Sequence, residues 1–227
     1  MVNKTGMFRN AARNAAAAAQ TEVVEADDFV LHKYADYETY RQVQEQGNKD
    51  KLTAQFVTKG HIFFLAGYLR NTLGPVDFGL CHGVRRGKEQ GWFRRKLKGA
   101  NVIGTDISET ANRFPNTVQW DFHEVNPEWS GKADFVYSNS WDHAYDPQKA
   151  FAAWLDALRP GGMLLIDHTA GHVPDSANAL DPFGVTEAGL HKILTGVLDV
   201  AGCVHEVLDR STDEQYPGKV FVCRKNA

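Results

Sequence analysis

The sequence predicts an α/β fold, a three-layer sandwich around a seven-stranded, mostly parallel sheet. From residue 75 onward, short apolar runs alternate with helical patterns, which is typical of a parallel sheet covered on both faces. The segment 76–106 is the clearest unit, with an apolar run, a glycine turn, a helical pattern and a second apolar run. The last two apolar runs, 204–208 and 219–224, have no helix between them and must pair antiparallel.

The turn at 82–87 and the acid at 106 predict a nucleoside site. Glycine lets the backbone pass close to a ligand, and the helix that follows offers unpaired amide groups. Asp106 ends the second run, where a carboxylate can accept hydrogen bonds from both ribose hydroxyls of an adenosine. An ordinary turn followed by a capping acid would show the same pattern.

Composition narrows the classes of function. The formal net charge of −3 gives no overall attraction to nucleic acid or anionic membranes, although basic residues crowd the segment 85–98. The three cysteines are far apart without metal spacing, which fits a reducing compartment. No apolar run approaches the ~20 residues that span a bilayer, so we expect a soluble, cytoplasmic protein. Residues 1–20 faintly resemble an organelle presequence, but we expect a flexible or helical lead-in.

We expect two parts, an N-terminal helical extension or lid at 1–74 and a main domain at 75–227. Apolar residues at helical spacing predict helices between 25 and 73, with a break at Gly47-Asn48, a resumed stripe at 52–57 and a stop at Gly74-Pro75. Such an extension could cover a substrate or pack against the edge of the sheet, and the pattern suits both.

Further strands and helices follow in order. Ser108 is a candidate cap for a short helix to Arg113. Strands are expected at 117–121, which ends on Asp121, at 133–138 and at 163–167. Asp146-Pro147 predicts a helix start, Pro160-Gly161-Gly162 its end, and Thr186 the cap of the last helix.

The order of these motifs resembles the class I methyltransferases that use S-adenosylmethionine. Residues 158–166 resemble that family's helix end and fifth strand, and residues 138–147 resemble its segment after the fourth strand. The resemblance covers about residue 75 to the C-terminus and implies a Rossmann-like fold. It implies that the glycine turn holds the methionine portion of the cofactor, Asp106 the ribose, Asp121 with Phe122 the adenine, and that Ser138 and Asn139 lie near the sulfonium. The cofactor-binding residues expected from it are His82, Gly83, Arg85, Gly87, Asp106, Ile107, Asp121, Phe122, Ser138 and Asn139.

The first motif departs from the family pattern of an acid followed by three glycines at alternate positions. Placing Asp77 at the acid leaves Cys81 at the middle glycine. Placing Cys81 at the acid puts Arg85 at the middle position and keeps the normal distance to Asp106. We prefer this second alignment, in which the first and third glycines are Gly83 and Gly87. Arg85 is then a candidate partner for the cofactor carboxylate.

Asp142 and His143 are the catalytic candidates, because they follow the fourth strand at the edge where ligands bind. A base helps methyl transfer when the acceptor is a hydroxyl, but His143 could equally be structural. His168 and His172 have metal-like spacing only on a helix, and the segment reads as a loop, so no metal is predicted. Aromatic side chains could line an acceptor pocket or fill the core: Trp141, Tyr145 and Phe183.

The resemblance implies a methyltransferase that uses S-adenosylmethionine and acts on a small-molecule or saccharide-like acceptor. We expect transfer to oxygen. No aromatic-proline signature follows the fourth strand, which argues against nucleic acid as the acceptor. Two alternatives remain: a non-catalytic module that binds S-adenosylmethionine or another nucleoside, and a nicotinamide-dependent oxidoreductase, which the terminal hairpin disfavours.

Overall fold

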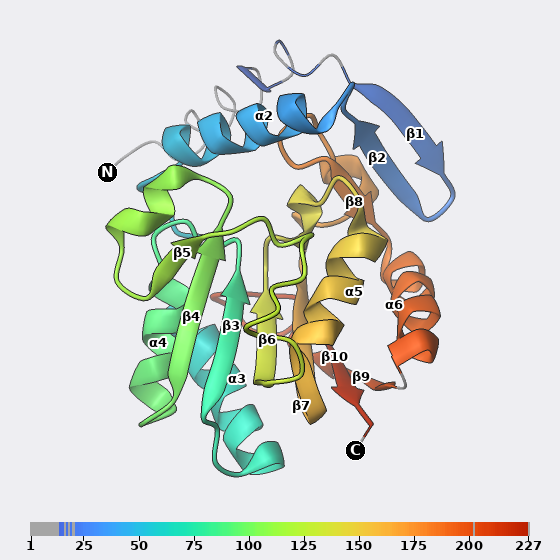
Figure 1. Ribbon diagram of the computed structural model, residues 1–227. Coiled ribbons are helices and arrows are strands. Elements are labelled where there is room, and N and C mark those ends of the chain that lie inside the picture. Colours follow the sequence, from blue (N-terminus) through green and yellow to red (C-terminus); the bar gives the residue numbers. More distant parts are fainter. Residues whose placement is uncertain (1–13, 16, 18, 20, 202, 227) are drawn as a thin grey trace.

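The computed structural model describes residues 14, 15, 17, 19, 21–201 and 203–226, and a seven-stranded sheet runs through its centre (Figure 1). The strand order is β5-β4-β3-β6-β7-β10-β9. All neighbours from β5 to β7 are parallel, whereas β10 is antiparallel to both β7 and β9. The predicted sheet and its terminal hairpin are therefore confirmed. The strands are β3 (Phe78–His82), β4 (Asn101–Asp106), β5 (Thr117–Gln119), β6 (Ala133–Ser138), β7 (Leu158–His168), β9 (Cys203–Asp209) and β10 (Lys219–Lys225).

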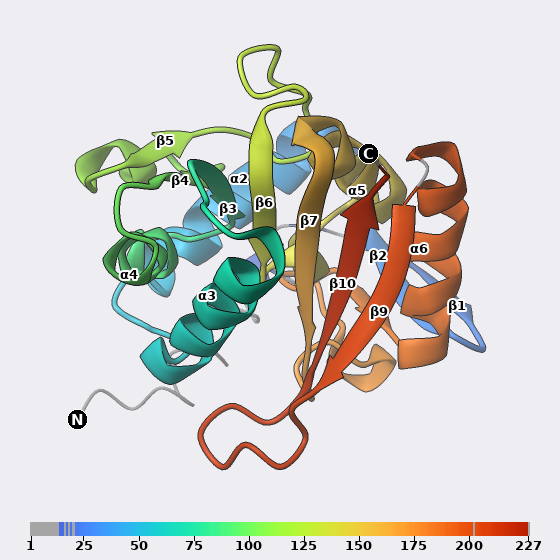
Figure 2. The same cartoon turned by 90° about the horizontal axis from the view of Figure 1, so that it is seen from below.

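Helices cover both faces of this sheet (Figure 2). Helices α3 (Lys59–Leu73) and α4 (Lys88–Lys96) lie on one face, and α5 (Pro147–Ala157) and α6 (Glu187–Ala201) lie on the other. Because side chains alternate along a strand, β6 contributes to two core clusters. Phe135 and Tyr137 pack towards α3 and α4, whereas Val136 packs towards α5 and α6.

The helix starts expected from capping residues are confirmed. The Asp146 side chain accepts a hydrogen bond from the Lys149 amide at 3.0 Å, at the start of α5. Thr186 Oγ1 accepts from the Gly189 amide at 3.0 Å and begins α6. Ser108 caps the short 3-10 helix η1 (Glu109–Arg113).

The N-terminal part differs from the expected run of helices. Residues 22–33 form an antiparallel hairpin, β1 (Glu22–Ala26) and β2 (Phe29–Lys33), and β2 pairs with β8 (Phe183–Val185) in a separate three-stranded sheet. Helix α2 (Tyr37–Asp50) continues through Gly47, where a break was expected. A Cβ on Gly47 would lie 2.2 Å from Leu180 Cδ1, so this glycine permits a close contact and does not end the helix. The stripe at 52–57 forms no helix.

Two strand boundaries also differ from expectation. Strand β7 begins at Leu158 and includes Pro160-Gly161-Gly162, which were expected to lie before it, because the sheet is irregular between Ala133 and Phe135 at that point. Strand β5 ends at Gln119, so Asp121 lies in the loop that follows. Most of residues 1–20, including nearly all of the presequence-like stretch, lie outside the described residues.

All three cysteines are free thiols. Within the described ranges, no helix combines the length and the hydropathy needed to cross a membrane.

Close packing in β3 gives a testable prediction. A Cβ on Gly79 would lie 2.1 Å from the Phe135 ring, so we expect Gly79→Ala to lower the free energy of unfolding by about 1–3 kcal/mol. Gly91 lies on the exposed side of α4 with open space around it, and Gly91→Ala should raise that free energy by about 0.5–1 kcal/mol. Urea unfolding of both variants checks this. Equal effects of the two substitutions would contradict the packing.

Candidate active site

The buried carboxylate of Asp106 lies at the centre of the site, at the carboxyl end of β4. Asp106 is only 3% exposed. Oδ2 accepts a hydrogen bond from the Arg85 amide at 2.9 Å, and Oδ1 accepts from the Ser108 amide at 3.0 Å and from Asn48 Nδ2 at 2.7 Å. Burial raises the pKa of Asp106, and the two backbone hydrogen bonds oppose that rise. The carboxylate therefore joins the glycine turn to α2, which lies across the carboxyl ends of the strands (Figure 1).

The glycine turn has a left-handed backbone at three alternate positions. The φ angles are +70° at Gly83, +50° at Arg85 and +70° at Gly87. Glycine adopts this region freely, but a residue with a Cβ is strained there. The alternation supports the alignment that places Arg85 at the middle glycine of the motif.

The Arg85 guanidinium is not a free cation, because it already makes hydrogen bonds to the backbone. Its Nη1 donates hydrogen bonds to the carbonyls of Lys51, at 2.6 Å, and Ala54, at 3.2 Å. These bonds hold the segment that follows α2 against the glycine turn. The expected pairing of Arg85 with a cofactor carboxylate would therefore compete with two existing hydrogen bonds.

A small cavity of about 30 Å³ lies directly over Asp106. Its volume suits about one water molecule, because side chains of α2 fill the space above the carboxylate. The chemistry of its walls nevertheless fits a nucleoside, because they contain the Asp106 carboxylate, the Phe122 ring and the backbone at Gly83. A nucleoside therefore fits the residues present only if α2 shifts. The walls are Tyr40, Gln44, Asn48, Lys51, Gly83, Arg85, Asp106, Ile107, Asp121, Phe122, Ser140 and His143.

Asp121 reaches this cavity from the loop after β5. It accepts hydrogen bonds from His123 Nδ1 at 2.7 Å and from the Tyr37 hydroxyl at 2.8 Å. Burial acts to raise the pKa of Asp121, but the hydrogen bonds from His123 and Tyr37 leave it below its ordinary value. The carboxylate is thus ionised and partly committed to protein partners.

Three of the expected cofactor residues line neither this small cavity nor the larger one that adjoins it. The His82 ring stacks on Trp154 at 5.1 Å, and burial lowers its pKa to about 3, so it stays neutral. Ser138 is fully buried, and its Oγ donates to the His82 carbonyl at 3.3 Å. Gly87 packs against Gln90 and Thr117. These residues form the floor beneath the turn.

A second cavity of about 410 Å³ adjoins the first and contains both predicted catalytic residues. The two cavities share Lys51, Arg85, Ser140 and His143. Asn139 lines only the larger one. Its other walls are Phe56, Asp142, Thr169, Gly171, His172, Leu180, Asp181 and Tyr216.

Asp142 lines this cavity, and one of its carboxyl oxygens is buried without a partner in the described part of the chain. Among the described residues, Oδ1 has no hydrogen-bond partner, although Asp142 is only 9% exposed. His172 Nε2 lies 3.9 Å from this oxygen. Burial raises the pKa of Asp142 to about 7, and the neighbouring His143 works against the rise. The carboxyl group therefore changes its protonation near neutral pH.

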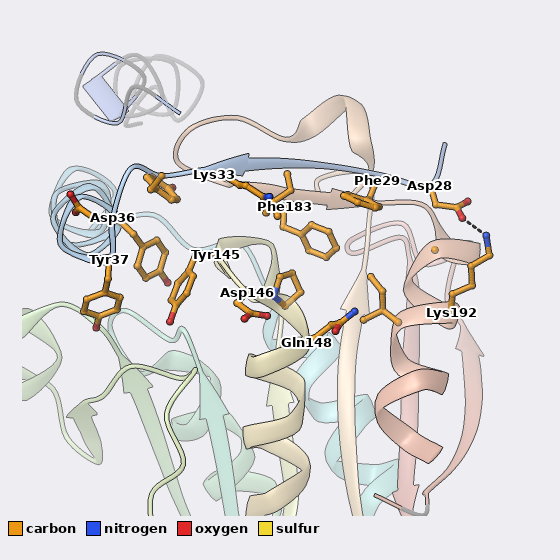
Figure 3. Close-up of a pocket in the computed structure, with 16 residues that line it drawn as sticks. Asp28, Phe29, Lys33, Asp36, Tyr37, Tyr145, Asp146, Gln148, Phe183 and Lys192 are labelled. Carbon is orange, nitrogen blue, oxygen red and sulfur yellow. Dashed lines mark hydrogen bonds and ion pairs between the residues drawn. The ribbon is translucent and has the colours of Figure 1, made fainter. Parts of the chain in front are cut away.

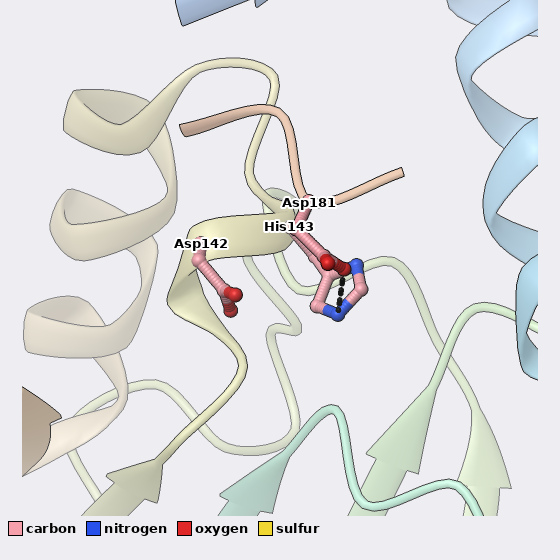
Figure 4. A group of neighbouring side chains, drawn as sticks. All are labelled: Asp142, His143 and Asp181. Atoms are coloured by element: carbon pink, nitrogen blue, oxygen red, sulfur yellow. Dashed lines mark ion pairs between the residues drawn. The ribbon is translucent and has the colours of Figure 1, made fainter. Parts of the chain in front are cut away.

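His143 differs from Asp142 because both of its ring nitrogens face a partner. Nδ1 lies 2.7 Å from Gln44 Oε1, and Nε2 lies 3.3 Å from Asp181 Oδ1 (Figure 4). The Lys51 ammonium lies 3.3 Å from the same Asp181 oxygen. Burial lowers the pKa of His143, and although burial acts to raise that of Asp181, Lys51 and His143 bring it to about 2. His143 is therefore a fixed group in an ion-paired cluster.

The same cluster could in principle hold a metal ion. Ligand atoms of Asp142, His143 and Asp181 lie within 4.8 Å of one another. The Lys51 ammonium, however, already pairs with the Asp181 oxygen that a metal would need. His168 and His172 each bind a backbone carbonyl, of Val185 at 2.8 Å and Asn139 at 2.9 Å. We assign no metal to either group.

A larger apolar groove of about 660 Å³ lies apart from Asp142, between β2 and the first turns of α5 and α6 (Figure 3). Phe29 and Phe183 lie on one side, and Tyr37 and Tyr145 lie near one end. The expected acceptor aromatics Tyr145 and Phe183 thus line this groove and not the cavity with Asp142. Trp141 is core, with its Nε1 donating to the Asp167 carbonyl at 2.6 Å.

The sequence does not predict several residues of the site. Gln44, Asn48 and Lys51 come from α2 and its end, Asp181 from the loop before β8, and Tyr216 from the loop between β9 and β10. Each is distant in sequence from the predicted motifs, and no local pattern marks it. The Lys51 side chain, buried despite its charge, becomes recognisable only when Asp181 is placed beside it.

The raised pKa of Asp142 predicts how stability depends on pH. In the unfolded chain this carboxyl ionises near its ordinary value of 3.8, whereas the folded protein keeps the proton up to about pH 7. Stabilisation from this group is therefore present below about pH 4 and is lost as the pH rises through 7, by up to about 4 kcal/mol. Asp142→Asn should reduce the loss of unfolding free energy between pH 5 and pH 8, measured in urea. An unchanged loss, equal to that of the exposed control Asp175→Asn, would contradict the buried carboxyl.

Known proteins resemble this chain in sequence and in fold. Residues 80–166, from β3 to β7, match the family model described as a methyltransferase domain. Solved structures share the fold: the 1,6-didemethyltoxoflavin-N1-methyltransferase of Burkholderia thailandensis has a TM-score of 0.60 and 17% identity over 91% of this chain and 99% of that one. The plantazolicin methyltransferase BpumL has a TM-score of 0.61 and 14% identity over 85% and 93%, respectively. CalS10, an amino pentose methyltransferase from Micromonospora echinaspora, has a TM-score of 0.57 and 13% identity over 74% and 91%. A comparison with curated protein sequences returns no match.

The matched segment contains the glycine turn, Asp106, Asp121 and the loop with Asp142, so the family model and the geometry concern the same residues. The structural likeness shows the fold, and the family match shows the kind of domain built on it. The chain therefore contains a segment that matches a methyltransferase domain, and it shares its fold with solved structures of methyltransferases.

Proposed function

We propose that the enzyme methylates a hydroxyl oxygen of a small, polar or saccharide-like molecule bound in the 410 Å³ cavity, with Asp142 as the general base. The observation that carries the proposal is the buried Asp142 carboxyl group in the wall of that cavity, whose Oδ1 has no hydrogen-bond partner among the described residues. Hydroxyl groups are poor nucleophiles until a base removes the proton, and a base with a pKa near the working pH is the most effective. Asp142, with its pKa raised to about 7, meets that requirement.

The size and walls of the cavity support a small acceptor. Small-molecule sites commonly have volumes of ~300–1,000 Å³ with a few convergent polar groups. The cavity of about 410 Å³ has amide, imidazole, carboxylate and hydroxyl groups in its wall. Two structural neighbours are named for small acceptors, 1,6-didemethyltoxoflavin and an amino pentose, which is consistent with this choice.

The cofactor is proposed to bind over Asp106, next to the acceptor cavity. When bound, S-adenosylmethionine supplies an activated methyl group on a sulfonium. Asp106 would hold the ribose hydroxyls, Asp121 and Phe122 the adenine, and the backbone at Gly83 the methionine portion, with Ile107 and Asn139 beside them. Arg85 acts in this proposal by fixing the turn.

The protein contributes alignment and proton removal. Asp142 accepts the proton of the acceptor hydroxyl, and the oxygen of that hydroxyl becomes the nucleophile. Asp142 keeps the proton until the product leaves. His143, fixed between Gln44 and Asp181, keeps Asp142 in place and limits the rise of its pKa. Lys51 balances the charge of Asp181, so only one carboxylate of the cluster is available to the acceptor.

We also propose that α2 opens to admit the cofactor, so that α2 serves as the lid within an N-terminal part at 1–74, ahead of a domain at 75–227. Asn48 occupies a position on Asp106 that a ribose hydroxyl would need. The three free thiols further support a proposed location in a reducing compartment such as the cytoplasm.

Transfer of labelled methyl groups tests the function. Incubation with methyl-labelled S-adenosylmethionine and a panel of sugars, polyols and phenols should give a labelled methyl ether, identified by mass spectrometry. Binding of the cofactor without transfer to any compound would instead favour a non-catalytic binding module, and a label on nitrogen or carbon would contradict the oxygen acceptor.

Replacement of the base should affect turnover and not cofactor binding. We expect Asp142→Asn to lower kcat by at least about 100-fold and to abolish the rise of kcat/KM towards a plateau above about pH 7. Binding of S-adenosylhomocysteine, followed by calorimetry, should change less than about twofold. The matched variant His143→Gln should lower kcat by much less and keep the pH dependence. A reversed order of the two effects would assign the base to His143.

Removal of the Asn48 amide tests the lid. Asn48→Ala takes away a donor that competes with the ribose for Asp106, so S-adenosylhomocysteine should bind about threefold more tightly, with a faster association rate. The unliganded protein should lose about 1–2 kcal/mol of unfolding free energy, because Asp106 loses a partner. Weaker ligand binding in this variant would mean that Asn48 contacts the ligand and does not exclude it.

A further inference from the structure

A chain of buried polar side chains ends at the wall of the acceptor cavity. It begins at Arg210, in the loop between β9 and β10, and continues through His61 of α3 to Asp167 of β7. His61 is 2% exposed and Asp167 is completely buried. From Asp167 it reaches Tyr216 and then Asn139. The proposed catalytic groups do not use this chain.

The first two links have only one possible direction. A guanidinium can only donate hydrogen bonds, so Arg210 Nη1 donates to His61 Nδ1 across 2.6 Å. An imidazole that accepts at Nδ1 carries its proton at Nε2. His61 Nε2 therefore donates to Asp167 Oδ1 at 2.9 Å.

The second oxygen of Asp167 receives two tyrosine hydroxyls. Tyr137 lies 2.5 Å from Oδ2, and Tyr216 lies 3.0 Å from it. Burial, together with the charge of Asp167, raises the pKa of both tyrosines well above their ordinary value, so each keeps its proton. Each hydroxyl has one proton, and a carboxylate can only accept. The Tyr216 hydroxyl thus donates its hydrogen bond to Asp167.

The direction of the hydrogen bond from Tyr216 to Asp167 determines the orientation of the Asn139 side-chain amide. Because the only proton of the Tyr216 hydroxyl is engaged in the hydrogen bond to Asp167, its oxygen can only accept from Asn139, so the group at 2.5 Å must be the Asn139 nitrogen, Nδ2. The Asn139 carbonyl of the main chain is held as well, by His172 Nε2 at 2.9 Å. Within the part of the chain that the structure describes, Oδ1 makes no hydrogen bond, and Asn139 is partly exposed on the 410 Å³ cavity.

We infer that Asn139 is a specificity-determining residue that presents its side-chain oxygen to the cavity, and that the acceptor molecule carries an N–H or O–H donor beside the atom that is methylated. Tyr216, Asp167, His61 and Arg210 are positioning residues, because they set which end of the amide faces the acceptor. This inference rests on the proposed function, since it needs the cofactor and the acceptor in the adjoining cavities. An amide free to rotate would offer its NH₂ group half of the time and would accept molecules of the opposite hydrogen-bonding character.

Sinefungin provides a probe that does not require the acceptor to be known. In this analogue an amine-bearing carbon replaces the methylated sulfur, so it offers N–H donors at the place of transfer, whereas S-adenosylhomocysteine offers none. We expect the wild-type protein to bind sinefungin at least about tenfold more tightly than S-adenosylhomocysteine, as one charge-assisted hydrogen bond allows. Calorimetry gives the ratio of the two dissociation constants.

Two tyrosine variants separate direction from packing. Tyr216→Phe frees the Asn139 amide and should reduce the ratio about fivefold, with S-adenosylhomocysteine binding nearly unchanged. Tyr137→Phe removes a hydroxyl from the same Asp167 oxygen without touching Asn139, so the ratio should stay at the wild-type value. Asn139→Asp, which keeps an oxygen acceptor, should retain the preference for sinefungin, and Asn139→Leu should abolish it.

The outcomes distinguish the inference from the function beneath it. If neither ligand binds the wild-type protein, the proposed function fails. If S-adenosylhomocysteine binds but the ratio is the same in wild type, Tyr216→Phe and Asn139→Leu, the inference is overturned while the function stands. Equal reductions in Tyr216→Phe and Tyr137→Phe would also overturn it, because they would reflect general damage around Asp167.

Discussion

The Asp106 carboxylate is the constraint on which the site depends. It lies where β4 leaves the sheet, and its three hydrogen bonds come from the glycine turn, from the residue that caps η1 and from α2. A buried carboxylate without such donors would be strongly destabilising, so these segments are held in one arrangement. One of the three bonds, from Asn48, comes from a side chain, and it is the one that a ribose hydroxyl replaces in the proposed complex. The other two come from the backbone.

The carboxyl groups around the acceptor cavity differ in whether they have partners. Asp181 is paired with Lys51 and faces His143, and Asp167 is surrounded by His61, Tyr137 and Tyr216, so both are satisfied acids. Asp142 is the acid at this cavity with an unpartnered oxygen among the described residues, and burial accordingly brings its pKa to about 7. The proposed base thus lies next to acids that already have partners, and different surroundings give neighbouring carboxyl groups different pKa values. The apolar groove beneath β2 takes no part in this polar order.

The sequence predicts most of the central fold, because alternation of apolar runs and capped helices is a local signal. Asp146, Thr186 and Ser108 cap the helices as expected, and Asp106 lies at the strand end where it was predicted. The sequence does not predict the N-terminal hairpin, because β2 is paired on its outer side by β8, about 150 residues later in the chain, and no local pattern marks that partner. The site was predicted in part. Asp142 and Asn139 follow β6 as expected, but Asn48, Asp181 and Tyr216 arrive through tertiary packing, and His82 turned out to face Trp154 because successive strand residues point to opposite faces.

Calorimetry of S-adenosylhomocysteine, with NAD as the comparison ligand and Asp106→Ala as the variant, tests the central claim most directly. We expect micromolar binding of S-adenosylhomocysteine to the wild-type protein, no binding of NAD, and loss of binding in Asp106→Ala while the variant stays folded. Absence of binding to the wild-type protein, or equal binding to the variant, would contradict the assignment of Asp106 as the centre of the cofactor site.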